Sequence, residues 1–389
     1  MSAELLTLEN PALKGIDLPA RRPIEKPNYR LPPGLEVISA DGHWEISEDV
    51  FFDRFPKNLR DRAPRVWFDE SYKAYNIGSP DAAKAIPLGE MAREMLETHY
   101  TRGIYDIDER LEHMLADGVS KEIVFPQVIL MYFNGPDLDV REEVFRIYNE
   151  HMAEKGARIP NRFYGVGVCS NWWDPNRMAT AVQQIKDLGL KTYMLPNNPG
   201  KNLQGKELNY SGEDMEPLWD AAEKAGLPVC FHVAETFNVE GRGVFGGFLL
   251  NTFGAFRKTV GQLIFGGVFD RHPNLKIVFA EGGISWVPPM LQDAEAIYDS
   301  YLSAIRPAIK HRPTYYWRNN CYATFQNDNL GLKQLNYIGE DRVMWAGDYP
   351  HPEGSHGYSH SSIKAVLELT SEAVARKILG DTARKVFNL

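Results

Sequence analysis

Short apolar runs recur along this chain, separated by longer segments of mixed polarity. The runs are rich in β-branched and aromatic residues and are almost continuously apolar. Such runs are typical of parallel strands that are covered on both faces. The pattern predicts eight strands, at residues 36–41, 121–126, 163–169, 190–195, 228–233, 275–281, 320–325 and 342–348.

Segments with the apolar spacing of amphipathic helices lie between these strands. Gly118, Gly189 and Gly226 each follow such a segment and mark a helix end just before a strand. Strands that alternate with helices predict a parallel sheet, and eight such units predict a closed (β/α)8 TIM barrel. The predicted helices are residues 106–116, 139–157, 174–188, 213–225, 255–271, 284–309, 330–335 and 360–379.

We expect the barrel to occupy residues 36–389 as a single domain, preceded by an arm at residues 1–35. The arm contains six prolines, which lack the N–H that helices and strand ladders need. It therefore predicts an extended segment over the barrel or over a neighbouring subunit, with a disordered tail as the alternative. Long βα loops at 42–105, 127–138 and 234–254 follow strands, so they should lie on the face where barrel enzymes carry their sites.

Composition narrows the classes of partner and compartment. The chain has 43 basic and 52 acidic residues, a formal charge of −9, and no basic cluster; this argues against nucleic acid and anionic membranes as partners. Cys169, Cys230 and Cys321 stand singly in apolar runs, which indicates buried thiols in a reduced, cytoplasmic protein. We find neither a secretory signal nor an apolar stretch long enough to span a bilayer.

Polar residues stand at the ends of four predicted strands. The first strand runs out into Asp41 and His43, the fifth ends in His232, the sixth in Glu281 and the eighth in Asp348. Each has an ordinary structural explanation when taken alone, such as a core histidine or a helix cap. The carboxyl ends of barrel strands share one mouth, so we expect the five side chains to converge there.

Two imidazoles and two carboxylates can hold one divalent cation and leave a position open for water or substrate. Such a cation lowers the pKa of water from about 15.7 to about 7 and polarises a substrate oxygen. We expect Asp348 to move the proton, assisted by Glu281 or His351. No lysine stands at a strand end, so a lysine-bridged metal pair is not supported and a single metal is favoured.

Aromatic residues and an arginine occur in the loops of the predicted mouth. We expect Trp44, His99, Arg102, Tyr132 and Trp286 to contact the substrate, since flat walls and a cation suit a planar or aromatic acid. The alternative is that these aromatics pack lids or subunit contacts. The arm and the long loops also lead us to expect a homodimer.

Several motifs carry a resemblance to a known family. The chain resembles the amidohydrolase superfamily over residues 37–389, and within it the group that includes aminocarboxymuconate semialdehyde and resorcylate-type decarboxylases. This resemblance implies a (β/α)8 barrel with a mononuclear metal site, Zn²⁺ first and Mn²⁺ as the alternative, held by Asp41, His43, His232 and Asp348. The motifs are SADGH at 39–43, DERLEHMLADGV at 108–119, the strand with His232, AEGGISWVP at 280–288, WAGDYPHPEG at 345–354 and ILGDTARKVFNL at 378–389.

Two positions depart from the pattern of that group. Asp41 stands where a histidine is frequent, and Glu281 stands where the decarboxylases carry a histidine that can protonate the substrate carbon. The main hypothesis is therefore a metal-dependent hydrolase of a small acid or amide, aromatic substrates included. The first alternative is a non-oxidative decarboxylase of an aromatic or unsaturated acid, and the second is a barrel that binds a ligand without turnover.

Overall fold

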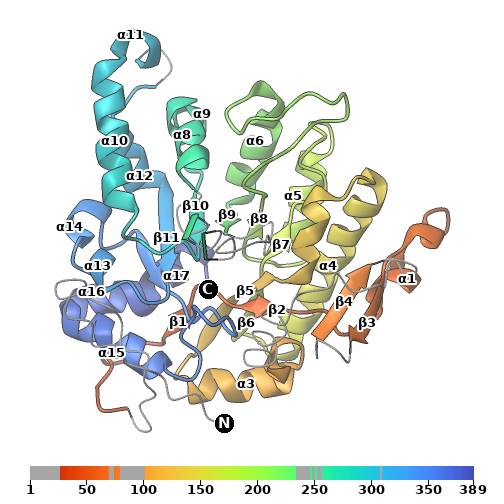
Figure 1. The fold of residues 1–389 in the computed structure, drawn as a ribbon, viewed down its shortest axis with the longest axis horizontal. Coiled ribbons are helices and arrows are strands. Elements are labelled where there is room, and N and C mark those ends of the chain that lie inside the picture. The colour runs from red at the N-terminus through yellow and green to blue at the C-terminus, as the bar shows by residue number, and fades with distance from the viewer. Residues whose placement is uncertain are drawn as a thin grey trace.

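The computed structural model places short strands at the centre of the molecule and helices around them (Figure 1). All the inner strands run parallel, as expected when helices make the connections. The structure describes residues 27–69, 74–78, 101–233, 246–247, 250–251, 256–306 and 309–389.

The inner strands fall at all eight predicted places, although most are shorter than predicted. The first predicted strand contains β1, with β2 just beyond its predicted end, and the third is represented by two pieces on either side of Val166. The strands are β1 (Ile38–Ser39), β2 (His43–Trp44), β5 (Lys121–Pro126), β6 (Phe163–Gly165), β7 (Gly167–Val168), β8 (Tyr193–Met194), β9 (Val229–His232), β10 (Ile277–Ala280), β11 (Cys321–Phe325) and β12 (Val343–Trp345).

Backbone hydrogen bonds link these segments into a ring. One sheet pairs β5 with β1, β2 and β6, and a second runs in the order β12-β11-β10-β9-β8-β7. The first and last segments are joined where Ala40 N donates to Trp345 O at 3.0 Å and Asp348 N donates to Asp41 O at 3.0 Å. The carboxyl ends of the first and eighth strands therefore lie side by side, which brings Asp41 next to Asp348.

Helices cover the outside of this ring, and most follow the predicted order. Positive φ values at Gly118, Gly189 and Gly226 confirm the predicted helix ends. The helices after the first long connection are α3 (Ile107–Ala116), α4 (Leu138–Arg158), α5 (Met178–Asp187), α6 (Glu216–Ala225), α8 (Arg257–Phe265), α9 (Val268–Arg271), α10 (Val287–Ser300), α11 (Leu302–Ile305), α12 (Pro313–Asn320), α13 (Asn329–Leu332), α14 (Leu335–Ile338), α15 (Ser359–Leu369), α16 (Glu372–Arg376) and α17 (Thr382–Phe387). Of these, α11 lies at the outer end of α10 (Figure 1) and has no buried residue.

The structure departs from the predicted elements at several points. The helix expected at 255–271 is broken between α8 and α9, where Gly267 has a φ of +68°. Helix α12 was not predicted. The connection 42–105 contains a helix, α1 (Val50–Arg54), and an antiparallel hairpin of β3 (Arg65–Asp69) and β4 (Ala74–Gly78). Most of the connection 234–254 lies outside the described residues.

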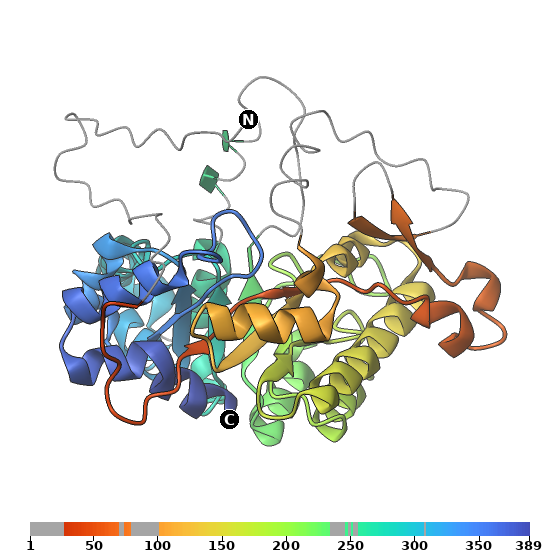
Figure 2. The same ribbon diagram turned by 90° about the horizontal axis from the view of Figure 1, so that it is seen from below.

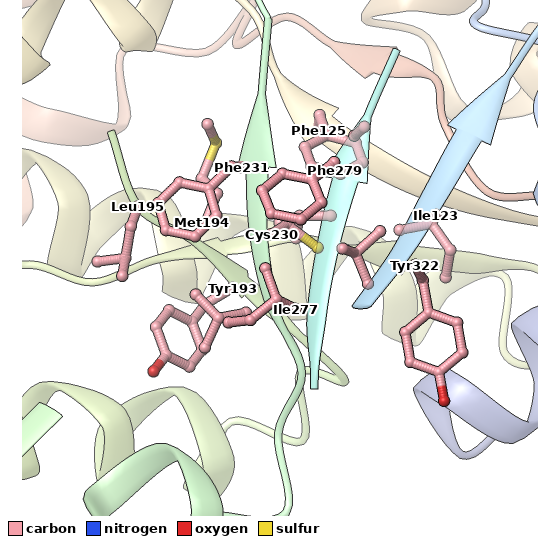
Figure 3. Packing of buried hydrophobic residues seen from close by; sticks show 14 of the residues in the cluster. Ile123, Phe125, Tyr193, Met194, Leu195, Cys230, Phe231, Ile277, Phe279 and Tyr322 are labelled. Carbon is pink, nitrogen blue, oxygen red and sulfur yellow. The ribbon is translucent and has the colours of Figure 1, made fainter. Parts of the chain in front are cut away.

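The hydrophobic core fills the space on both faces of the strands. Every residue of β9 and β10 is buried, as the continuous apolar runs predicted. Figure 3 shows side chains of neighbouring strands packed together, among them Phe231 and Phe279, whose rings stack with centroids 6.0 Å apart. This packing fixes the strand ends that carry the polar residues.

The described part of the arm lies along the C-terminal helices, and Figure 2 shows this red segment beside the blue helices. Arg376 donates to Pro33 O at 2.8 Å, and Arg384 donates to Glu36 at 2.6 Å. Residues 27–36 thus lie against the C-terminal helices, whereas residues 1–26 lie outside the described residues, so the arm at 1–35 stays a prediction. No helix in the described ranges is both long enough and apolar enough to cross a bilayer.

Candidate metal centre

The polypeptide after β1 is held so that Asp41 and His43 turn toward the ring axis. Ser39 Oγ donates to Asp41 O at 2.6 Å, and His43 N donates to Tyr349 O at 2.7 Å. Glycine is needed at position 42, because a Cβ there would lie 2.3 Å from Glu122 Oε1. The loop that carries Asp41 and His43 is thereby fixed between Glu122 of β5 and Tyr349, which follows β12.

Five predicted residues converge at the strand ends. His232 Nε2 lies 3.4 Å from Asp41 Oδ1 and 3.2 Å from Glu281 Oε2. His43 Nε2 lies 3.1 Å from Asp348 Oδ1 and 3.9 Å from Asp41 Oδ1. All five side chains are buried, none with more than 3% of its side-chain surface exposed. The first, fifth, sixth and eighth strands thus contribute to a single polar cluster inside an apolar barrel.

His351 joins this cluster from the turn after Asp348. Its Nδ1 lies 3.4 Å from Asp348 Oδ1 and 3.6 Å from Glu281 Oε1. Its ring stacks on the ring of His43, with centroids 4.0 Å apart and an interplanar angle of 23°. The expectation that His351 lies near the strand-end residues agrees with this geometry.

The spacing of these atoms fits a bound cation. Two donors that each lie about 2.1 Å from one ion are about 3.0 Å apart at a right angle and about 3.4 Å apart at a tetrahedral angle. The closest contacts of His232, His43 and His351 with the carboxylates fall at or near these values. Asp41 Oδ2 is buried and has no hydrogen-bond partner. Because buried polar atoms are usually hydrogen-bonded, this oxygen is a suitable ligand for a cation. Imidazole and carboxylate donors suit Zn²⁺ and Mn²⁺.

Two of the carboxylates stand on unusual backbone. Glu281 has a φ of +68° and Asp348 a φ of +53°, a region that residues other than glycine rarely adopt. Neighbouring side chains stabilise the conformations: Thr324 Oγ1 accepts from Glu281 N at 2.8 Å, and Gln326 Nε2 donates to Asp348 Oδ2 at 3.3 Å. Such strain is concentrated at functional sites.

Burial and mutual charge shift the pKa values of the cluster. Burial raises the pKa of Asp41 to about 6, and burial together with the charge of Asp348 raises the pKa of Glu281 to about 8. Burial lowers the pKa of His43 to about 3. Burial would also lower the pKa of His232, but the charges of Asp41 and Glu281 outweigh it and raise that pKa to about 9. A cation would compete with these protons, since it binds the neutral imidazole and the ionised carboxylate.

Two glutamines that the sequence analysis did not identify also contact the cluster. Gln127 directly follows β5, and its Oε1 lies 3.2 Å from His351 Nε2. Gln326 directly follows β11 and, besides Asp348, donates to Glu281 O at 3.4 Å. Both glutamines stand at strand ends. The search for acidic residues and histidines at strand ends would therefore have found them if it had included side-chain amides.

The five residues expected to contact substrate do not lie together as the strand-end residues do. His99 lies outside the described residues. Trp44 is buried, and its indole N–H donates to His151 Nε2 on α4 at 3.1 Å. It therefore packs between the strands and a helix, a position that neither substrate contact nor the alternative of lids and subunit contacts anticipated.

The other three lie in loops or at a helix start and are not part of the cluster. Arg102 has 67% of its side chain exposed and pairs with Asp106 at 2.9 Å. Tyr132 is half-buried in the 3₁₀ segment η5 (Val128–Asn134), which follows β5. Trp286 is half-buried, and its indole N–H donates to Gly283 O at 2.9 Å. Their contact with substrate stays a prediction.

Comparisons with known proteins agree with the predicted barrel fold. A family model described as Amidohydrolase matches residues 99–389. The chain is 26% identical to 2-amino-3-carboxymuconate-6-semialdehyde decarboxylase of Dictyostelium discoideum, over 77% of this chain and 82% of the relative. It is 25% identical to gamma-resorcylate decarboxylase of Rhizobium radiobacter, over 72% of this chain and 87% of the relative.

Solved structures show the same fold. One is 5-carboxyvanillate decarboxylase of Novosphingobium aromaticivorans, complexed with manganese and 4-hydroxy-3-methoxy-5-nitrobenzoic acid. The TM-score is 0.64 and the identity 22%, with 92% of this chain and 97% of that chain covered. The arrangement of strands and helices is therefore that of a known enzyme fold, which supports the predicted barrel.

Proposed function

This chain belongs to the amidohydrolase family, and we propose that within it the chain is a metal-dependent, non-oxidative decarboxylase of a small aromatic or unsaturated acid. The observation that carries the proposal is the buried cluster of carboxylates and imidazoles at the strand ends. Similarity to two decarboxylases over most of the chain favours decarboxylation, the alternative in the sequence analysis, over hydrolysis.

We assign one cation to Asp41, His43, His232 and Asp348. These residues come from three strand ends, and His43 links them. Its Nε2 lies 3.9 Å from Asp41 Oδ1 and 3.1 Å from Asp348 Oδ1, and His232 Nε2 lies 3.4 Å from Asp41 Oδ1. When bound, the cation supplies a Lewis acid that polarises substrate oxygen atoms. Either Mn²⁺ or Zn²⁺ matches the donors, and a similar fold binds manganese.

Glu281 is the residue we assign to proton delivery. Loss of carbon dioxide breaks the bond between the substrate carbon and its carboxyl carbon and leaves the electron pair on the substrate carbon. That carbon must then gain a proton. Glu281 is buried beside the assigned ligands, 3.2 Å from His232, and in the metal-free chain burial raises the pKa of its carboxyl to about 8, which favours the protonated acid. After transfer, water returns a proton to Glu281, so atoms and charge balance.

The test is turnover by the metal-loaded full chain in D2O. We would supply gamma-resorcylate, 5-carboxyvanillate and related unsaturated acids, then measure released carbon dioxide and deuterium in the product. Carbon dioxide with one deuterium at the former carboxyl position supports the proposal. A hydrolysed product without release of carbon dioxide would contradict the proposal and show that the protein is a hydrolase. Saturable binding of the acids without turnover would favour the ligand-binding alternative.

Glu281→Gln distinguishes the proton donor from the metal ligands. We expect this variant to keep its metal and to lose at least 100-fold in turnover, which is in the range of general acid catalysis. Loss of metal from Glu281→Gln would instead show that Glu281 is mainly a ligand.

A further inference from the structure

His351 lies in the turn after the eighth strand, and the assignment of four metal ligands gives it no role. We propose that His351 is a fifth protein ligand of the cation, which it binds through Nδ1, and that Gln127 positions it. The inference rests on the proposed metal site but does not require that the protein be a decarboxylase.

The donor geometry places His351 among the ligands. Donor atoms of His351, His43, Asp348 and Glu281 all lie within 4.8 Å of one another, and His43 is shared with a second such group that contains Asp41 and His232. The distance of 3.4 Å from His351 Nδ1 to Asp348 Oδ1 is close to the separation of about 3.0 Å between two neighbouring ligands at a right angle, as in a six-coordinate site.

The two ring nitrogens of His351 have different surroundings. Nε2 lies 3.2 Å from the amide oxygen of Gln127, which can only accept, so Nε2 carries the hydrogen. Nδ1 is buried and has no hydrogen-bond partner. In the neutral ring, Nδ1 therefore presents its lone pair to the cluster. A histidine that donates one nitrogen to an oxygen and offers the other to a metal is the usual arrangement of a metal ligand.

The chain delivers His351 through a short turn. His351 N donates to Asp348 O at 2.9 Å, so the spacing of three residues brings both side chains to the same point. The stacking of His351 on the ring of His43 limits rotation of its side chain. Neither contact alone selects a ligand role, but together with the Gln127 hydrogen bond they fix which nitrogen faces Asp348.

A fifth ligand changes which cation the site prefers. Structural and catalytic zinc sites use three or four protein ligands in a tetrahedral arrangement, whereas manganese accepts six-coordinate sites rich in oxygen. With His351 the assigned set reaches five, and a substrate oxygen would make six. We therefore expect the native chain to prefer Mn²⁺ more strongly than a chain without His351.

The experiment measures metal binding without substrate. Purified apoprotein and its His351→Ala and His351→Gln variants are titrated with Mn²⁺ and Zn²⁺ against a chelator. We expect Mn²⁺ affinity to fall 10- to 100-fold in both variants and Zn²⁺ affinity to fall less. In the Co²⁺-loaded protein, the visible absorption should intensify as the coordination number falls. Circular dichroism of the apoproteins shows whether each variant is folded.

Two further variants test the role of Gln127. Gln127→Leu removes the hydrogen-bond acceptor while keeping a similar side-chain volume. We expect it to weaken Mn²⁺ binding about 10-fold, the smallest loss usually seen when a residue that hydrogen-bonds a metal ligand is removed. Gln127→Glu retains the acceptor and should restore binding to within threefold of the native value. The matched control is His356→Ala, because His356 Nδ1 pairs with Asp117 at 2.8 Å; its metal affinity should not change.

The outcomes separate this inference from the proposed function. Unchanged Mn²⁺ affinity and an unchanged Co²⁺ spectrum in both His351 variants would overturn the ligand assignment, even if the native chain released carbon dioxide. Reduced affinity in those variants supports the assignment, even if every acid tested were left intact. Electron spin-echo measurements on Mn²⁺ with ¹⁵N-histidine count bound imidazoles, and a native count of two would also overturn it.

Discussion

His232 is the residue whose loss should damage the cluster most directly, since it separates two carboxylates. His232→Ala would leave Asp41 and Glu281 buried beside each other without an imidazole between them. We expect the variant to lose its metal and all measurable turnover, with elemental analysis of the purified protein as the measurement. The control is His272→Ala: His272 also lies between two carboxylates, 3.0 Å from Glu216, but away from the cluster. Full metal content in His232→Ala would rule out the metal assignment.

Gly42 makes a second prediction at the scale of single residues. Gly42→Ala would push a methyl group to 2.3 Å from Glu122 and to 2.8 Å from Arg110. We expect a loss of about 1–3 kcal/mol in the free energy of unfolding, the usual range for overpacking, and weaker metal binding. Urea denaturation and a metal titration measure the two effects.

The control for this steric argument is Gly261→Ala in α8, where a Cβ would meet nothing within 4 Å. Alanine in a helix gains about 0.5–1 kcal/mol over glycine, so this variant should be at least as stable as the native chain. If Gly42→Ala were equally stable, the close approach of the loop to Glu122 would not be needed.

The strand-end rule identified the charged members of the cluster from sequence alone. Asp41, His43, His232, Glu281 and Asp348 are brought together because parallel strands in a barrel end at one mouth. The glutamines after β5 and β11 were missed because amides rarely mark chemistry in a sequence and turns are rich in polar residues. The substrate contacts were harder still, since whether an aromatic faces a mouth or a helix depends on packing that no local spacing encodes.

At the scale of elements, a buried ion pair between Arg110 of α3 and Glu122 of β5 joins a helix to a strand close to His43. Arg110 is fully buried, and its Nη2 lies 2.8 Å from Glu122 Oε2; its Nη1 donates to His43 O at 2.6 Å. Arg110→Met would leave the Glu122 carboxylate buried without a partner, which costs about 3–5 kcal/mol. We expect that loss in urea denaturation, together with weaker metal binding, because His43 loses its backbone support.

Two companion variants test this interpretation. Arg102→Met breaks the exposed pair with Asp106 and should cost only about 0–1 kcal/mol. The double variant Arg110→Met/Glu122→Met removes both buried charges, so it should be more stable than Arg110→Met alone. If the double variant were no more stable, the cost would come from lost packing and not from the unpaired carboxylate.

The elements themselves were predictable wherever hydrophobic periodicity was long and uninterrupted. Helix α4 matches its predicted range of 139–157 to within one residue, because its apolar stripe runs over several turns. The break between α8 and α9 was missed, since a left-handed Gly267 interrupts a stripe that continues on both sides. The hairpin of β3 and β4 was also missed, because it lies outside the barrel repeat and is joined to it by long connections.

At the scale of the whole molecule, the sequence predicted the order of the strands and a closed barrel, but it did not predict which contacts close the ring. Eight alternating units fix a parallel order, whereas closure depends on contacts between residues more than 300 positions apart, such as Ala40 with Trp345. The course of the arm from residue 27 onward likewise rests on single hydrogen bonds to the C-terminal helices. The expected homodimer stays a prediction, which light scattering of the purified chain would check.

The cation should stabilise the whole barrel and not merely the mouth. Its assigned ligands come from the first, fifth and eighth strands, so binding joins the start of the ring to its end and reduces repulsion between buried carboxylates. At a free metal concentration of 100 times Kd, the gain in the free energy of unfolding is about 2.7 kcal/mol. We expect Mn²⁺ to raise the Tm of the apoprotein in a concentration-dependent manner by differential scanning calorimetry. His232→Ala should show no such rise, and an equal rise in that variant would mean that the ion binds elsewhere.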